Sequence, residues 1–146
     1  MVRKLVSKQC HQTLQEGWRA LDVAIARLRE QYDGGIVSVI LFGSFARGNP
    51  DYEDIDLLIV TDVPAAPTHE TTRELAERIF GSLFWEYGEL VSFLVYDHSQ
   101  FQRLRNSLPL FQEIKDEGIL LYGKDVFAET ASEDLPENRP PSTGDG

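Results

Sequence analysis

The stretch that decides the fold is IVSVILFGSFARG (Ile36–Gly48), followed five residues later by DIDLLIV (Asp54–Val60). The first part is β-branched and almost entirely apolar, which is typical of a strand buried on both faces. Gly43 and Ser44 end that strand, and a short helical turn is predicted before the chain breaks at Gly48. The second part predicts another strand, so a short loop joins two neighbouring strands.

A helix is predicted ahead of these strands, over about residues 7–32. Its apolar residues recur at steps of three and four, the spacing of one helix face, and Gly34 and Gly35 supply the stop. The members of that stripe are Leu14, Trp18, Leu21, Ile25, Leu28 and Tyr32.

A second long helix is predicted after the two strands. A Pro-rich loop over residues 62–67 leads to a helix over about residues 71–87, which we expect to open on a capping box formed by Thr71 and Glu74. Near its end, Phe84 and Trp85 can belong to the core or to a partner surface, and the core is favoured. The remaining elements are a strand, two helices and a short last strand, over about residues 90–96, 101–106, 109–117 and 119–122.

This order of elements predicts an α/β (α+β) protein with a small sheet flanked by helices. The length of 146 residues indicates one domain. We expect that domain to span residues 1–127, with its core over residues 36–123. Residues 128–146 are almost without apolar side chains and rich in acidic residues and proline, which predicts a disordered acidic tail.

Composition limits the partners and the compartment. The net charge of −10 disfavours a nucleic-acid partner, which needs clustered Lys and Arg, but a bound Mg²⁺ would still let an acidic site accept a nucleotide. Cys10 is the only cysteine, so a disulfide within the chain is excluded. The charged N-terminus is unlike a signal peptide, and no apolar run approaches the roughly 20 residues of a membrane helix. We expect a cytoplasmic protein that does not enter a membrane.

Asp54 and Asp56 are the candidate metal ligands and catalytic residues. Residues two apart on a strand project from the same face, about 6.6 Å apart. Their carboxylates can therefore converge on one or two Mg²⁺ ions, which prefer carboxylate and phosphate oxygens. Two such ions would stabilise the attacking and leaving oxygens of an in-line phosphoryl displacement.

Gly43, Ser44 and Arg47 are the candidate nucleotide-binding residues. A small residue at the end of a strand lets backbone N–H groups approach a phosphate, and Ser44 adds a hydroxyl donor. Arg47, one turn further on, can offer a bidentate fork to a phosphate or to the aspartate pair. Each feature alone is usually a turn, a solvated strand end or a surface charge. Together and in this order they are far less expected by chance.

The motif Gly43–Gly48 (GSFARG), the nine residues between Ser44 and Asp54, and the DIDLLIV strand resemble the minimal nucleotidyltransferases of the DNA polymerase β-like superfamily. The stretch Phe111–Gly123 also resembles the end of such domains. The resemblance implies a polymerase β palm-like fold with a mixed sheet, Gly43 and Ser44 holding a triphosphate, and Asp54 and Asp56 binding Mg²⁺. It also implies transfer of a nucleoside monophosphate, commonly AMP from ATP, to a hydroxyl.

One position departs from that family. A third carboxylate usually stands on the next strand, and the matching residue here is Ser92, which cannot bridge metals or act as a base at neutral pH. Glu89 and Asp97 are each an odd number of residues from Ser92, so in a regular strand they face the other side.

Two functions follow from the resemblance. The first is an active Mg²⁺-dependent nucleotidyltransferase acting on a partner protein, because the chain shows no helical domain after Gly123 that would complete an acceptor pocket. The second is a catalytically weak antitoxin that neutralises a helical HEPN-domain toxin, because relatives are often paired with such proteins in toxin–antitoxin modules. Either function implies a HEPN-type partner or a homo-oligomer.

Overall fold

The computed structural model describes residues 8–32, 34–62 and 68–128. The predicted tail therefore lies outside the described residues, apart from Ala128, which ends a 3₁₀ turn. None of the helices in the described ranges is long and apolar enough to cross a membrane. The elements are α1 (Lys8–Gln31), β1 (Ile36–Phe42), α2 (Gly43–Ala46), β2 (Asp54–Thr61), α3 (Thr68–Glu74), the π-helical segment η1 (Leu75–Phe80), α4 (Gly81–Tyr87), β3 (Leu90–Asp97), α5 (His98–Leu104), α6 (Pro109–Glu117), β4 (Ile119–Gly123) and η2 (Val126–Ala128).

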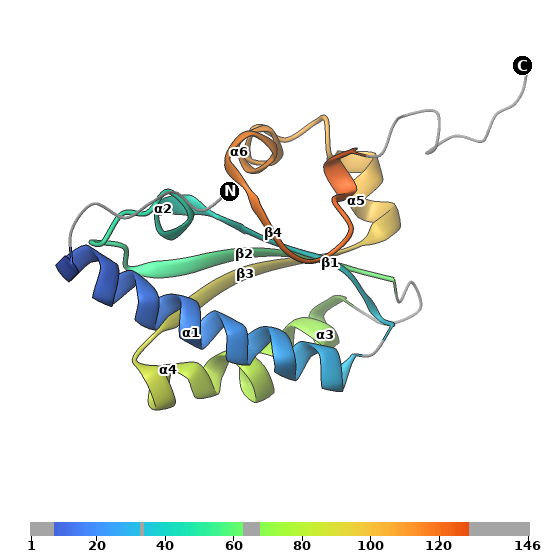
Figure 1. Ribbon diagram of the computed structural model, residues 1–146. Helices are drawn as coiled ribbons and strands as arrows, with labels where there is room; N and C mark the ends of the chain where they lie inside the picture. Colours follow the sequence, from blue (N-terminus) through green and yellow to red (C-terminus); the bar gives the residue numbers. More distant parts are fainter. Residues whose placement is uncertain (1–7, 33, 63–67, 129–146) are drawn as a thin grey trace, which may run out of the picture.

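The strands form one mixed sheet in the order β3-β2-β1-β4 (Figure 1). β1 runs antiparallel to both β2 and β4, as a short connection between β1 and β2 requires. β2 and β3 are parallel, and the helical segment from α3 to α4 makes the crossover between them. The small mixed sheet flanked by helices is thus confirmed.

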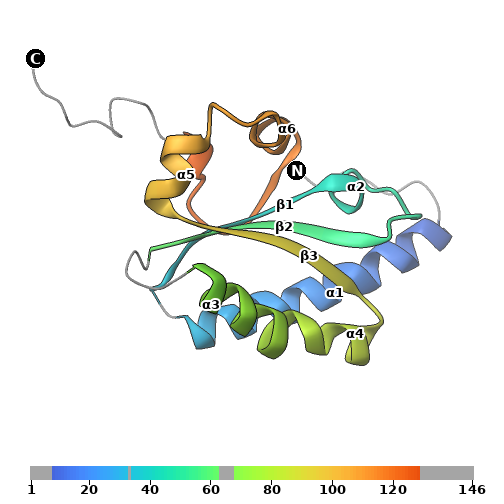
Figure 2. The ribbon, with the colours of Figure 1, turned by 180° about the vertical axis from the view of Figure 1, so that it is seen from behind.

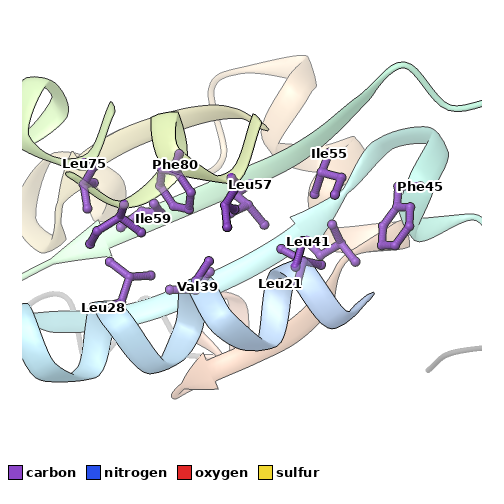
Figure 3. Packing of buried hydrophobic residues seen from close by; sticks show 14 of the residues in the cluster. Leu21, Leu28, Val39, Leu41, Phe45, Ile55, Leu57, Ile59, Leu75 and Phe80 are labelled. Carbon is purple, nitrogen blue, oxygen red and sulfur yellow. The ribbon is translucent and has the colours of Figure 1, made fainter. Parts of the chain in front are cut away.

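Each face of the sheet is covered by its own helices. Figures 1 and 2 show α1, α3 and α4 on one face and α2, α6 and α5 on the other, with α2 and α5 at opposite ends. The alternation along β2 explains this arrangement. Ile55, Leu57 and Ile59 are completely buried against the α1 side (Figure 3). Leu58 and Val60 are buried against the α5 and α6 side.

The strand predictions are confirmed within one residue at each end, and α1 confirms the predicted first helix. The capping box at Thr71 is wrong, because α3 already begins at Thr68, directly after the Pro-rich stretch, and Thr71 lies inside it. The core assignment of Phe84 and Trp85 is also wrong: their side chains are 44% and 84% exposed. The buried face of that helix is instead used by Leu75, Ile79, Phe80 and Leu83.

Ser38 on β1 gives a test of the core. Its side chain is completely buried and its hydroxyl has no hydrogen-bond partner. Because a buried unpaired polar group destabilises the folded state, we expect Ser38→Ala to raise the free energy of unfolding by about 1 kcal/mol in urea denaturation. Ser82→Ala is the control and should lower it, since the Ser82 hydroxyl accepts from Arg27 at 2.7 Å and donates to the Ile79 carbonyl at 3.2 Å. A loss of stability in Ser38→Ala comparable to that in Ser82→Ala would contradict this account.

Candidate functional site

Asp54 and Asp56 lie at the start of β2, on the face that α2 and α6 cover. Ile55 between them is completely buried on the opposite face, and this burial fixes the direction of both carboxylates. Both aspartates are partly exposed, because the core under α5 and α6 begins only at Leu58. The structure therefore confirms that the pair shares one face, at an open end of the sheet.

Gly43 lies directly against this pair. In the β1–β2 register, Phe42 is the partner of Asp56, so the next residue of the chain turns over the Asp56 carboxylate. Gly43 has a φ of +85°, and a Cβ built on it would collide with the Asp56 Oδ2. Glycine is thus required at this position for two reasons: the backbone is left-handed, and there is no space for a side chain. The first turn of α2 is held close to the carboxylates.

Phe45 anchors the rest of α2 in the core. Its ring is almost completely buried between Trp18 of α1 and Tyr52, at centroid distances of 5.3 Å and 4.7 Å. Ser44 precedes it and is partly exposed at the start of α2. The turn therefore has one residue fixed in the core and, next to it, one that is partly exposed.

Arg47 is close to the aspartates but is engaged elsewhere. Its Nη1 lies 2.9 Å from the Glu117 Oε1 at the end of α6, in a largely exposed ion pair. Its positive charge nevertheless acts to lower the pKa of Asp56. The pair links the loop after α2 to α6, and binding of a phosphate by Arg47 would compete with Glu117.

Ser92 of β3 is a third polar side chain beside Asp54 and Asp56. It is the register partner of Asp56 across the parallel strands, and its hydroxyl donates a 2.9 Å hydrogen bond to the Asp54 Oδ2. The residue on β3 beside the two aspartates is thus a hydroxyl donor that orients Asp54.

The electrostatics of the pair favour a cation. Burial raises the pKa of Asp56 above its usual range, the charge of Asp54 raises it further, and Arg47 only partly opposes them. Two converging carboxylates that repel each other form a donor set that fits Mg²⁺. Within the described ranges no group of three or more His, Cys, Asp or Glu side chains is placed to hold a metal ion.

Glu89 and Tyr52 form a contact that sequence reasoning missed. Glu89 is only 8% exposed, and both of its carboxylate oxygens accept from the Tyr52 hydroxyl, at 2.9 Å and 3.0 Å. Burial raises the pKa of Glu89. The contact ties the loop before Asp54 to the start of β3. It lies on the α1 face, as the odd spacing from Ser92 predicted, and no local sequence signal links the two residues.

Asp97 is excluded from the site by a structural role. At the far end of β3 its carboxylate accepts from the Gln100 amide at 2.8 Å and caps α5, while the Gln100 side chain accepts from the Asp97 amide. Glu89 and Asp97, the acidic neighbours of Ser92 in the sequence, are thus both engaged away from the aspartate pair.

Two solved structures resemble the chain weakly. One is a provisionally named nucleotidyltransferase of Sulfolobus solfataricus, with a TM-score of 0.47, 16% identity, and coverage of 82% of this chain and 91% of that one. The other is a mutant of the toxin–antitoxin complex MntA–HpeT, with a TM-score of 0.45, 20% identity, and coverage of 68% and 70%.

Sequence comparison gives closer relationships. Two proteins of Methanocaldococcus jannaschii, both provisionally named protein adenylyltransferases, are similar to the chain. The first is 31% identical over 105 residues, covering 71% of this chain and 96% of the relative. The second is 26% identical over 111 residues, covering 73% and 72%. The family model of the nucleotidyltransferase domain matches residues 21–117, which include the α2 turn, the aspartate pair and Ser92. The chain belongs to the nucleotidyltransferase domain family.

Proposed function

We propose that the chain is a Mg²⁺-dependent nucleotidyltransferase that transfers AMP from ATP to a hydroxyl group of a partner protein. The observation that carries this proposal is the close approach of Gly43 to Asp56, which brings the start of α2 against a pair of repelling carboxylates. A triphosphate and a divalent cation are the ligands that suit those two features together. The names of the two M. jannaschii relatives support protein as the acceptor.

The roles of the residues follow from their positions. Gly43 and Ser44 would hold the triphosphate through backbone N–H groups of the α2 turn and the Ser44 hydroxyl, since the first amides of a helix lack partners within it. Asp54 and Asp56 would hold Mg²⁺, with the Ser92 hydroxyl fixing the orientation of Asp54. Bound Mg²⁺ would supply positive charge to the phosphate oxygens. Arg47, once released from Glu117, would add a second cation.

A second candidate is an antitoxin-type module that neutralises a HEPN-domain toxin by binding it. The observation that favours it is Ser92, because a hydroxyl already donating to Asp54 is not a base for the acceptor. The two candidates differ in one readout. The enzyme transfers label from α-labelled ATP to a protein, whereas the binding module does not.

Calorimetric titration of ATP with and without Mg²⁺ tests the proposal. We expect Asp54→Asn combined with Asp56→Asn to weaken Mg²⁺-dependent ATP binding by about 100-fold, because two charged ligands at about 1.5 kcal/mol each are lost. Asp62→Asn, which removes an exposed carboxylate just beyond the other end of β2, is the matched control and should bind as the wild type does. Unchanged binding in the double variant would refute the site, and a wild type that does not bind Mg²⁺-ATP would refute the function.

Gly43 and Gly48 form a matched pair for the loop. Their φ angles are +85° and +80°, but only at Gly43 would a Cβ meet another atom, the Asp56 carboxylate. We expect both Gly→Ala variants to lose about 1 kcal/mol of stability to the left-handed backbone. Only Gly43→Ala should also lose about tenfold in Mg²⁺-ATP affinity, since the turn must move away from the carboxylates. Equal affinities in the two variants would show that the close approach has no part in binding.

Because the pKa of Asp56 is raised, we expect that replacing this carboxylate by a neutral side chain stabilises the folded protein, by an amount that depends on pH. A carboxyl whose pKa is raised by folding costs stability once it ionises, so the penalty grows as pH rises above the ordinary value of 3.8 and persists at neutral pH. We therefore expect metal-free Asp56→Asn to be more stable than the wild type at pH 7, with the difference shrinking towards about pH 4. Urea denaturation in EDTA measures it, with Asp62→Asn as control. If the difference in the free energy of unfolding between Asp56→Asn and the wild type did not change with pH, ionisation of Asp56 would not be its cause.

A further inference from the structure

Within the sheet, the carboxylates of Asp54 and Asp56 are covered by other elements towards β1 and lie near an exposed edge towards β3. On the β1 side, α2 packs over β2, and the Arg47–Glu117 pair joins the loop after α2 to α6. On the other side, β3 is the edge strand of the described sheet. Its residue Leu90 is the register partner of Asp54 and is 50% exposed. The aspartates can therefore be approached from the β3 side.

The segment that leads into this edge is unusually apolar for a surface. Of the seven large apolar side chains that are exposed in the described ranges, Phe84, Trp85, Tyr87 and Leu90 fall within seven consecutive residues. Trp85 is 84% exposed, and its ring lies 5.3 Å from that of Phe84, centroid to centroid. Figures 1 and 2 place α4 at the same end of the sheet as α2. A tryptophan this exposed is typical of an interaction surface.

The chemistry of the proposed function indicates which partner would bind at the β3 edge. In an in-line displacement the attacking oxygen enters opposite the leaving group. If α2 holds the triphosphate, pyrophosphate leaves towards the β1 side and the acceptor hydroxyl must enter from the β3 side. The exposed carboxylates Asp51 and Glu53, immediately before Asp54, add negative charge at the start of β2 within a chain of net charge −10.

We propose that the segment Phe84–Leu90 and the outer edge of β3 form the docking surface for the acceptor protein. The partner would present an apolar socket for Trp85, positive charge opposite Asp51 and Glu53, and a hydroxyl side chain beside Ser92. The acceptor oxygen bonds to the α-phosphorus of ATP, the bond from that phosphorus to the bridging oxygen breaks, pyrophosphate leaves, and the hydroxyl proton passes to solvent or to a base of the partner. This inference rests on the proposed function and adds the position and character of its partner.

Two leucines on the two edge strands allow a matched test. Leu90 of β3 is 50% exposed and Leu120 of β4 is 43% exposed, on opposite edges of the sheet. The wild type, Trp85→Ala, Leu90→Ser and Leu120→Ser are each incubated with Mg²⁺, α-labelled ATP and a protein extract of the source cells. Labelled protein is then quantified after nuclease and, separately, after protease treatment. Melting temperature and Mg²⁺-ATP affinity of each variant are measured alongside.

We expect Trp85→Ala and Leu90→Ser to reduce protein labelling by about tenfold or more, with Mg²⁺-ATP affinity within twofold of the wild type, while Leu120→Ser labels normally. Equal labelling by all four proteins overturns the proposal, as does equal loss in Leu120→Ser. Label that nuclease removes, or a wild type that binds Mg²⁺-ATP but labels no protein, also overturns it while leaving the nucleotide site intact. A wild type that does not bind Mg²⁺-ATP instead overturns the proposed function itself.

Discussion

The close approach of Gly43 to the Asp56 carboxylate is the constraint on which the site depends. It is set by the antiparallel register that pairs Phe42 with Asp56, and that register is fixed by the apolar faces of β1 and β2. A slip of one residue would turn both aspartates into the core and Ile55 towards solvent. The large core beneath α1 therefore determines the position of a turn of four residues, and Phe45 carries that constraint into α2.

The site is stabilised by its surroundings rather than by its own residues. The raised pKa of Asp56 means that its ionised carboxylate destabilises the folded state when no cation is present. The charge of Arg47 acts in the opposite direction on Asp56, but Arg47 is also paired with Glu117. Such local destabilisation, compensated by a well-packed sheet, is consistent with the proposed binding of a divalent cation.

The sequence predicts most of the sheet and the common face of Asp54 and Asp56, because both follow from local periodicity. Strands such as Ile36–Phe42 are predictable from their apolar composition, and the i, i+2 rule places the aspartates without knowledge of the fold. What the sequence cannot predict are contacts between distant residues, such as Tyr52 with Glu89 or Arg47 with Glu117. The core assignment of Trp85 is wrong for a related reason: the buried face of its helix is formed by other residues, among them Phe80 and Leu83, and the Trp85 side chain is exposed.

Ser92 connects the chemistry of the site with the exposure of its edge strand. A carboxylate at this position would add a third negative charge beside Asp54 and Asp56, in a region where burial already raises the pKa of Asp56. A hydroxyl avoids that repulsion and orients Asp54, but it leaves the acceptor side without a base of its own. Of the neighbouring carboxylates, Glu89 faces α1 and is bound to Tyr52, while Asp97 caps α5. If the proposed transfer takes place, the hydroxyl proton passes to solvent or to a group that enters with the partner, across the same edge of β3 that exposes Leu90.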